Sequence, residues 1–202
     1  RSMRELLGGK GANLAEMSNA GVPVPPGFTV STEACGIYEK QGAYPKEMMQ
    51  QVKKELTKLE KLEGKKLGAA KNPLLVSVRS GAAQSMPGMM DTVLNLGMND
   101  KSIQGFIDVT GNARAGWDCY RRFIDMFGDV VMGPTSTLEH HHFEEALTSI
   151  KKKYKAKQDT DLTAEQLEEL VGDYKKIYKK HVKDDFPQDP MKQLEYSINA
   201  VF

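Results

Sequence analysis

The chain carries three short segments whose residue types could bind an anionic group. The first is Gly8-Gly9-Lys10-Gly11. Glycines let a backbone turn tightly and direct several N–H groups at one point. A helix starting near Ala12 would add positive potential at its N-terminus, and Lys10 would add a mobile charge. The spacing is not that of a Walker A loop, so a plain glycine-rich turn with a surface lysine stays an alternative.

The second segment, Val76-Ser77-Val78-Arg79-Ser80-Gly81, places an arginine directly after a β-type run. Ligands usually meet a sheet at the carboxyl ends of its strands. The guanidinium of Arg79 could form paired hydrogen bonds with phosphate oxygens, which the two serines and the loop amides could share. The alternative is that Arg79 pairs with a carboxylate at the sheet edge.

The third segment, Gln84–Thr92, is rich in methionine. Met86, Met89 and Met90 are three methionines in five residues, and they surround Pro87-Gly88. Their flexible, polarisable side chains could cover a flat base or a phosphate chain. Packing into a core is the ordinary alternative for methionine. Taken together, the three segments point to a phosphate-bearing ligand more strongly than any one of them.

Histidines and cysteines offer weaker candidates. His140-His141-His142 could suggest a metal site, but adjacent histidines on a helix point in different directions and a ligand pair needs i, i+4 spacing. We therefore expect no native metal site there, and we expect His181 to be a packed or surface residue. Cys35 and Cys119 form no CxxC motif, which favours two buried free thiols over a disulfide or a zinc site.

The elements that must position these residues differ between the two halves of the chain. Up to Asn99, short apolar runs are broken by glycine and proline, which is typical of a mixed α/β or α+β unit. Periodicity predicts the order helix, strand, helix, strand, strand. The predicted helices are 11–20 and 45–62, and the predicted strands are 28–31, 74–78 and 92–96.

After Asp100 the pattern is helical throughout. Thr163 to Gln166 forms a capping box, and Pro190 suits the first turn of a helix. These signals predict a small helical bundle. The helices are expected at 117–131, 143–154, 164–178 and 190–201. We predict a three-part organisation of residues 1–99 as an α/β lobe, 100–187 as a helical subdomain, and 188–202 as the start of a helix that returns toward the first lobe.

Composition excludes several classes of protein. The 202 residues carry 28 basic and 27 acidic side chains, a net charge of +1, which lacks the basic excess of a nucleic-acid-binding protein. No apolar stretch is long enough to span a bilayer, and the N-terminus is not a signal peptide. We therefore expect a cytoplasmic location, with an organelle as the alternative. The start at Arg1 suggests a cut inside a longer chain.

Four longer segments of the chain carry a family resemblance: GGKGANLAEM, GVPVPPGFTVSTEAC, NPLLVSVRSGAAQSMPGMMDTVLNLGMND and YRRFIDMFGDVVMG. They resemble the opening part of the pyruvate, phosphate dikinase family. The related phosphoenolpyruvate synthase (water dikinase) shares the glycine–lysine loop and a VRS-type segment but lacks the SMPGMMDT continuation, so it is the alternative.

The resemblance implies an α+β fold class, in which an incomplete ATP-grasp-type lobe precedes a small helical bundle. It implies that Lys10 and Arg79 contact the phosphates of ATP. Met90 and Thr92 would border the nucleotide, and Arg122 would anchor its phosphate end. The backbone of the phosphate loops would comprise Gly8, Gly9, Gly11, Ser80 and Gly81.

The family interconverts ATP, phosphate and pyruvate with AMP, pyrophosphate and phosphoenolpyruvate, through a phosphohistidine on a separate domain. The resemblance places the Mg²⁺ ligands, the adenine contacts and that histidine beyond Phe202. It therefore implies no catalytic residue and no metal ligand within these residues, and a chain that is inactive alone. Its partners would be ATP, phosphate and the remaining domains of a parent homodimer. The non-enzymatic alternative is a folded scaffold.

Overall fold

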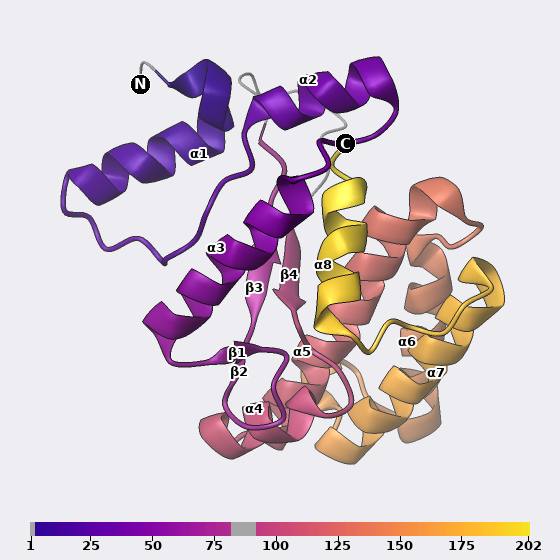
Figure 1. Ribbon diagram of the computed structural model, residues 1–202. Helices are drawn as coiled ribbons and strands as arrows, with labels where there is room; N and C mark the ends of the chain where they lie inside the picture. Colours follow the sequence, from indigo (N-terminus) through magenta and orange to yellow (C-terminus); the bar gives the residue numbers. More distant parts are fainter. Residues whose placement is uncertain (1–2, 82–91) are drawn as a thin grey trace. The chain divides into compact units, whose positions relative to one another are not determined.

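The structure is a computed structural model that describes residues 3–81 and 92–202 (Figure 1). It comprises two compact units. Of the described residues, unit 1 contains 3–64, 79–81 and 201–202, and unit 2 contains 65–78 and 92–200. Each unit is described by itself.

Unit 1 begins with a helix that is broken near its start. Helix α1 (Arg4–Asn19) contains Gly8 at φ 69° and ψ 170°, a backbone conformation that glycine reaches at little cost. The break separates a first turn from a second helical segment that starts at Gly9, and Figure 1 shows α1 as two helical pieces. The chain therefore changes direction immediately before Lys10.

Two further helices complete the regular structure of unit 1, namely α2 (Thr32–Gln41) and α3 (Met48–Glu63). The amphipathic helix expected at 45–62 is confirmed as α3, whose buried stripe consists of Met48, Val52 and Leu56. An aromatic cluster links α2 to the last residue, because the ring of Tyr38 lies 5.5 Å from that of Phe202.

The strand predicted at 28–31 is wrong. Residues 22–31 form no strand, and the chain runs extended into Ser31, the N-cap of α2, at φ −71° and ψ 154°. Phe28 remains 38% exposed. Alternating apolar residues favour an extended backbone but do not supply the neighbouring strand that a sheet requires.

Unit 2 contains two small sheets. Strands β1 (Lys66–Leu67) and β2 (Pro73–Leu74) pair in parallel, and β3 (Val76–Val78) and β4 (Val93–Leu96) pair antiparallel. The strand predicted at 92–96 is confirmed as β4. The run predicted at 74–78 is divided at Leu75 between β2 and β3. Small sheets combined with helices confirm the α+β class.

The rest of unit 2 is helical. The four helices expected after Asp100 are confirmed, whereas α4 was missed by the sequence analysis. The helix expected at 117–131 changes to a wider π-helical turn, η1 (Phe127–Met132), in its second half. The five α-helices are α4 (Ser102–Thr110), α5 (Ala113–Met126), α6 (His140–Tyr154), α7 (Ala164–Val182) and α8 (Pro190–Asn199).

A cluster of buried aromatic rings forms the core of unit 2. Phe186 lies 5.6 Å from both Phe123 and Phe127 and 5.3 Å from Tyr178, measured between ring centroids. The rings meet edge to face, the arrangement that aromatic quadrupoles favour. The cluster packs α5 against α7 and against the segment that leads into α8.

Both predicted start signals in this half are confirmed. The hydroxyl of Thr163 accepts a hydrogen bond from the backbone N–H of Gln166 at 3.4 Å, and the amide oxygen of Gln166 accepts one from the N–H of Thr163 at 3.1 Å. Pro190 occupies the first turn of α8, after the capping residue Asp189. Among the described helices, none is long and apolar enough to cross a membrane.

The three-part organisation at 1–99, 100–187 and 188–202 stays a prediction. The two compact units reflect packing within the chain. A domain is also defined by independent folding, which packing alone does not establish.

Candidate functional site

The turn at Gly8 presents Lys10 to solvent. Gly8 is buried and Lys10 is exposed, so the backbone of the turn is covered while the amine is accessible. The helix was expected to start near Ala12, but it resumes at Gly9. Lys10 therefore lies in the first turn of this second helical segment, where backbone N–H groups add to its positive charge.

The structure brings Lys10 next to the second predicted segment. A methyl group at Gly81 would lie 3.7 Å from Cβ of Lys10, which is ordinary van der Waals contact. The Gly8–Gly11 and Arg79–Gly81 segments, which are far apart in sequence, therefore adjoin within unit 1. The contact brings together one residue from each of two segments expected to bind the same ligand.

Both cations predicted to bind phosphate, Lys10 and Arg79, are accessible. Arg79, which follows β3 directly in the chain, is exposed, whereas Ser80 is only 7% exposed. Within residues 3–81 and 92–202, neither Lys10 nor Arg79 is paired with a carboxylate. The alternative of an arginine neutralised at the sheet edge is therefore not seen in the described residues.

Two threonines contact the backbone on either side of Gly8 and Lys10. Thr32, the first residue of α2, donates its hydroxyl hydrogen to the carbonyl oxygen of Glu5 at 2.5 Å, and the carbonyl of Leu6 lies 3.3 Å away. A methyl group at Gly11 would lie 3.0 Å from Cγ2 of Thr29 and 3.1 Å from its Oγ1. The sequence analysis missed both threonines, because their contacts with α1 are not local.

The other three predicted contacts, Met90, Thr92 and Arg122, are not among the described residues of unit 1. Met90 and the methionine-rich loop fall in 82–91, outside the described residues. Thr92 is half-buried and precedes β4 in unit 2. Arg122 is also in unit 2, on α5, and its Nε donates to Oδ2 of Asp118 at 3.0 Å. Its side chain is 59% exposed.

The preceding residue, Arg121, is the buried arginine of the pair. Its side chain is 5% exposed, and its Nη2 donates to Oδ1 of Asp118 at 2.7 Å. Asp118 is therefore shared by both arginines. Asp159 lies 3.9 Å from Arg121 and 2.9 Å from Lys151, whose hydrogen bond and charge lower the pKa of this carboxyl. These ion pairs hold the segment between α6 and α7 against α5, so the charges stabilise the fold.

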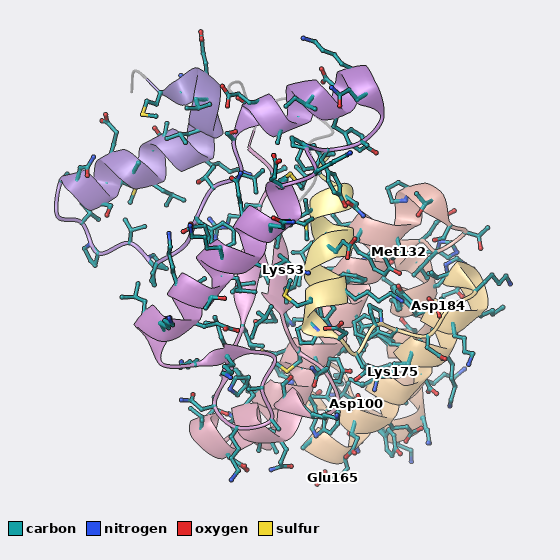
Figure 2. The ribbon with its side chains drawn as sticks, viewed as in Figure 1. Lys53, Asp100, Met132, Glu165, Lys175 and Asp184 are labelled. Atoms are coloured by element: carbon teal, nitrogen blue, oxygen red, sulfur yellow. The ribbon has the colours of Figure 1, made fainter. Side chains whose placement is uncertain are left out.

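A second cluster in unit 2 consists of polar and charged side chains that bind one another. Asp100 and Lys175 form an ion pair, and their labelled side chains can be followed in Figure 2. The hydroxyl of Tyr120 donates to Oδ1 of Asp100 at 2.8 Å and accepts from Nε2 of Gln188 at 3.3 Å. Burial raises the pKa of Tyr120, so its hydroxyl keeps its proton. This tyrosine thus acts as a structural donor.

The histidines each have protein partners. His140 at the start of α6 lies 2.8 Å from Asp125, whose hydrogen bond raises the pKa of the imidazole. The rings of His142 and His181 lie 3.9 Å apart. Burial, followed by the neighbouring charge of His142, lowers the pKa of His181. In the part of the chain that the structure describes, no group of three or more His, Cys, Asp or Glu could hold a metal ion.

Both cysteines are free and half-buried. Burial and the nearby carboxylate of Asp118 raise the pKa of the Cys119 thiol, which makes it less reactive than an ordinary cysteine. The prediction of free thiols is confirmed, but the two cysteines are half-buried rather than buried as predicted.

Comparison with known families and proteins points to the same segments. The family described as "Pyruvate phosphate dikinase, AMP/ATP-binding domain" matches residues 4–44. This span contains Lys10 with its flanking glycines, as well as Thr29 and Thr32. The match therefore covers the turn at Gly8 and the two threonines that contact the backbone on either side of it.

Similarity to curated relatives extends along the whole chain. The chain is 52% identical over 199 residues to "Pyruvate, phosphate dikinase" of Giardia intestinalis, covering 98% of this chain and 22% of the relative. It is 51% identical over 203 residues to that of Clostridium symbiosum, covering 100% and 23%. It is 53% identical over 203 residues to "Pyruvate, phosphate dikinase 1, chloroplastic" of Zea mays, covering 100% and 21%.

These matches confirm the resemblance indicated by the sequence motifs. None of those named favours the phosphoenolpyruvate synthase alternative. The chain spans about a fifth of the length of the curated relatives it matches.

Proposed function

We propose that this chain is the first part of the ATP-binding region of a pyruvate, phosphate dikinase, in which Lys10 and Arg79 contact the phosphates of ATP. One observation supports the proposal above all. Gly81 lies against Lys10, so two segments with anion-binding residue types adjoin, and both cations are accessible. The family description names an AMP/ATP-binding domain, which supports ATP as the ligand. The relatives matched along the chain are dikinases, which supports phosphoryl transfer as the reaction.

The chemistry suits these side chains. Phosphoryl transfer depends mainly on positioning the phosphates and on neutralising the charge that develops on their oxygens. Lys10 would supply a mobile point charge, and Arg79 would supply two parallel hydrogen bonds. The proposed cradle is the backbone of Gly8, Gly9, Gly11, Ser80 and Gly81.

The residues in this part of unit 1 fit an anion better than a metal ion. They offer amines, guanidinium, hydroxyls and backbone N–H groups, whereas Mg²⁺ prefers carboxylate oxygens and water. We therefore assign the phosphates of ATP to these residues. We propose that the Mg²⁺ that accompanies ATP takes its protein ligands from other parts of the dikinase.

The whole reaction and the remaining contacts complete the proposal. The parent protein would interconvert ATP, phosphate and pyruvate with AMP, pyrophosphate and phosphoenolpyruvate, through a phosphohistidine on another domain of a homodimer. Met90 and Thr92 would border the nucleotide. The family resemblance also assigns Arg122 to the phosphate end of the nucleotide. A requirement for inorganic phosphate separates this reaction from that of a water dikinase.

Location and independent activity are also proposals. We propose a cytoplasmic parent protein, with an organelle as the alternative suggested by the chloroplastic Zea mays relative. We further propose that these 202 residues bind ATP weakly and do not catalyse the reaction alone.

Calorimetric titration of the chain with Mg-ATP tests the phosphate contacts. Lys10→Ala and Arg79→Ala should each weaken binding about tenfold or more, since a hydrogen bond to a charged group contributes about 1.5–3 kcal/mol. Lys53→Ala is the matched control, because Lys53 is an exposed lysine on α3 of the same unit (Figure 2). Equal affinity in all three variants would contradict the proposal.

A further inference from the structure

The hydroxyl of Thr32 reaches backbone carbonyls that lie just before the turn at Gly8. Its Oγ1 lies 2.5 Å from the carbonyl oxygen of Glu5 and 3.3 Å from that of Leu6. In a regular helix these two carbonyls accept the N–H groups of Gly9 and Lys10, four residues later. Thr32 therefore gives them a donor that does not come from the proposed phosphate loop.

The conformation of Gly8 makes such an external donor useful. With ψ at 170°, the backbone leaves helical geometry between the first turn of α1 and the segment that starts at Gly9. A carbonyl left without its usual partner costs free energy, and a hydroxyl from another element can satisfy it. The N–H groups after the break are then available to an anion rather than to the preceding turn.

Thr29 fixes the other side of the same turn. A methyl group at Gly11 would lie 3.0 Å from Cγ2 of Thr29, so the helical segment that carries Lys10 packs closely on this side chain. Thr29 and Thr32 come from one short stretch of chain around the start of α2. That stretch therefore contacts the backbone both before Gly8 and after Lys10.

We propose that Thr32 is a positioning residue for ATP, which fixes the first turn of α1 so that the backbone after Gly8 and the amine of Lys10 face the phosphates. The inference rests on the proposed function of Lys10. Thr32 does not touch the nucleotide in this account and acts only through the carbonyls of Glu5 and Leu6. A merely structural tie between α1 and α2 would stabilise the unit without affecting phosphate chemistry.

Two substitutions at Thr32 separate these roles. Thr32→Val keeps the shape but removes the donor, whereas Thr32→Ser keeps the donor. The matched control is Thr57→Val, which removes a hydroxyl that donates to the carbonyl of Lys53 at 2.9 Å on α3 of the same unit. The assay is the rate at which saturating Mg-ATP phosphorylates the full-length protein that carries this sequence, together with the apparent Kd for ATP and the melting temperature.

Thr32→Val should lower the phosphorylation rate about tenfold, roughly the upper limit for one neutral hydrogen bond. Thr32→Ser should stay within about twofold of the unchanged protein, as should Thr57→Val. If Thr32→Val does not fold, Thr32→Ala replaces it with the same expected result, because it removes the donor and adds no bulk beside Glu5.

Three results separate the inference from the proposed function. A rate for Thr32→Val equal to that of Thr57→Val, while Lys10→Ala abolishes phosphorylation, would overturn the inference and leave the proposed function intact. Equal losses in Thr32→Val and Thr32→Ser that follow the melting temperature would overturn it in favour of a structural tie. Normal phosphorylation in Lys10→Ala would refute the proposed function itself.

Discussion

Replacing Gly81 by aspartate places a negative charge at the contact between the two proposed phosphate-binding segments. A side chain at Gly81 would start 3.7 Å from Cβ of Lys10, so it meets no steric conflict with residues 3–81 and 92–202. The backbone of Gly81 is also outside the left-handed region that glycine alone tolerates well. Gly81→Asp should therefore fold normally and change mainly the local charge.

The magnitude follows from Coulomb's law. An aspartate carboxylate at this position would come within about 5 Å of the Lys10 amine or of a phosphate oxygen beside it. Two unit charges at that distance interact by about 0.8 kcal/mol at a dielectric constant of 80 and about 3.3 kcal/mol at 20. Because the site is solvent-accessible, the lower half of this range applies best, and ATP binding should weaken by roughly 4- to 30-fold.

The assay is the Kd for Mg-ATP at two salt concentrations, with Gly81→Asn as the uncharged control of the same shape. Gly81→Asn should bind within about threefold of the unchanged chain. The gap between the two variants should narrow at 1 M salt, where the Debye length falls to about 3 Å. Equal affinities for Gly81→Asp and Gly81→Asn at low salt would refute the placement of phosphate beside Lys10.

Three further predictions concern stability in unit 2. Gly105→Ala should lower the free energy of unfolding in urea by about 3 kcal/mol or more, because its methyl group would lie 2.3 Å from the backbone carbonyl oxygen of Ala70. The control Gly172→Ala meets nothing within 4 Å and should be neutral or stabilising. Arg121→Met removes the buried partner of Asp118 and leaves that carboxylate with the exposed Arg122 alone, so it should cost about 1–3 kcal/mol. Arg122→Met keeps the buried pair and should cost less than about 1 kcal/mol in the same assay. His181, whose folded-state pKa is lowered, should contribute stability above about pH 6.5 that is lost as pH falls through the folded pKa. His181→Gln should remove that part of the pH dependence of the unfolding free energy, and an unchanged pH profile would contradict a lowered pKa at His181.

Local sequence signals predicted the helical half of the chain well. The capping box at Thr163 and the proline at Pro190 mark helix starts that depend only on neighbouring residues, and the structure confirms both. The stripe of Met48, Val52 and Leu56 likewise identifies α3 from spacing alone. Such features are predictable because a helix satisfies its own backbone hydrogen bonds.

Features that depend on distant partners were not predictable in the same way. The strand expected at 28–31 required a neighbour that this segment lacks. The contact of Gly81 with Lys10 joins residues far apart in the chain, and so does the hydrogen bond from Thr32 to Glu5. Lys10 and Arg79 can be identified as candidates from their residue types and their neighbours in the sequence, but only the fold shows which distant residues support them.

Phosphorylation of the full-length protein by ATP tests the central claim most directly. The transfer of labelled phosphate to the protein would be followed for the unchanged sequence, Lys10→Ala, Arg79→Ala and the control Lys53→Ala. Each of the first two variants should lose about 100- to 1,000-fold in rate, the usual effect of removing one donor to transition-state charge, while the control is unaffected. Near-normal phosphorylation in both Lys10→Ala and Arg79→Ala would show that these side chains do not bind the phosphates of ATP.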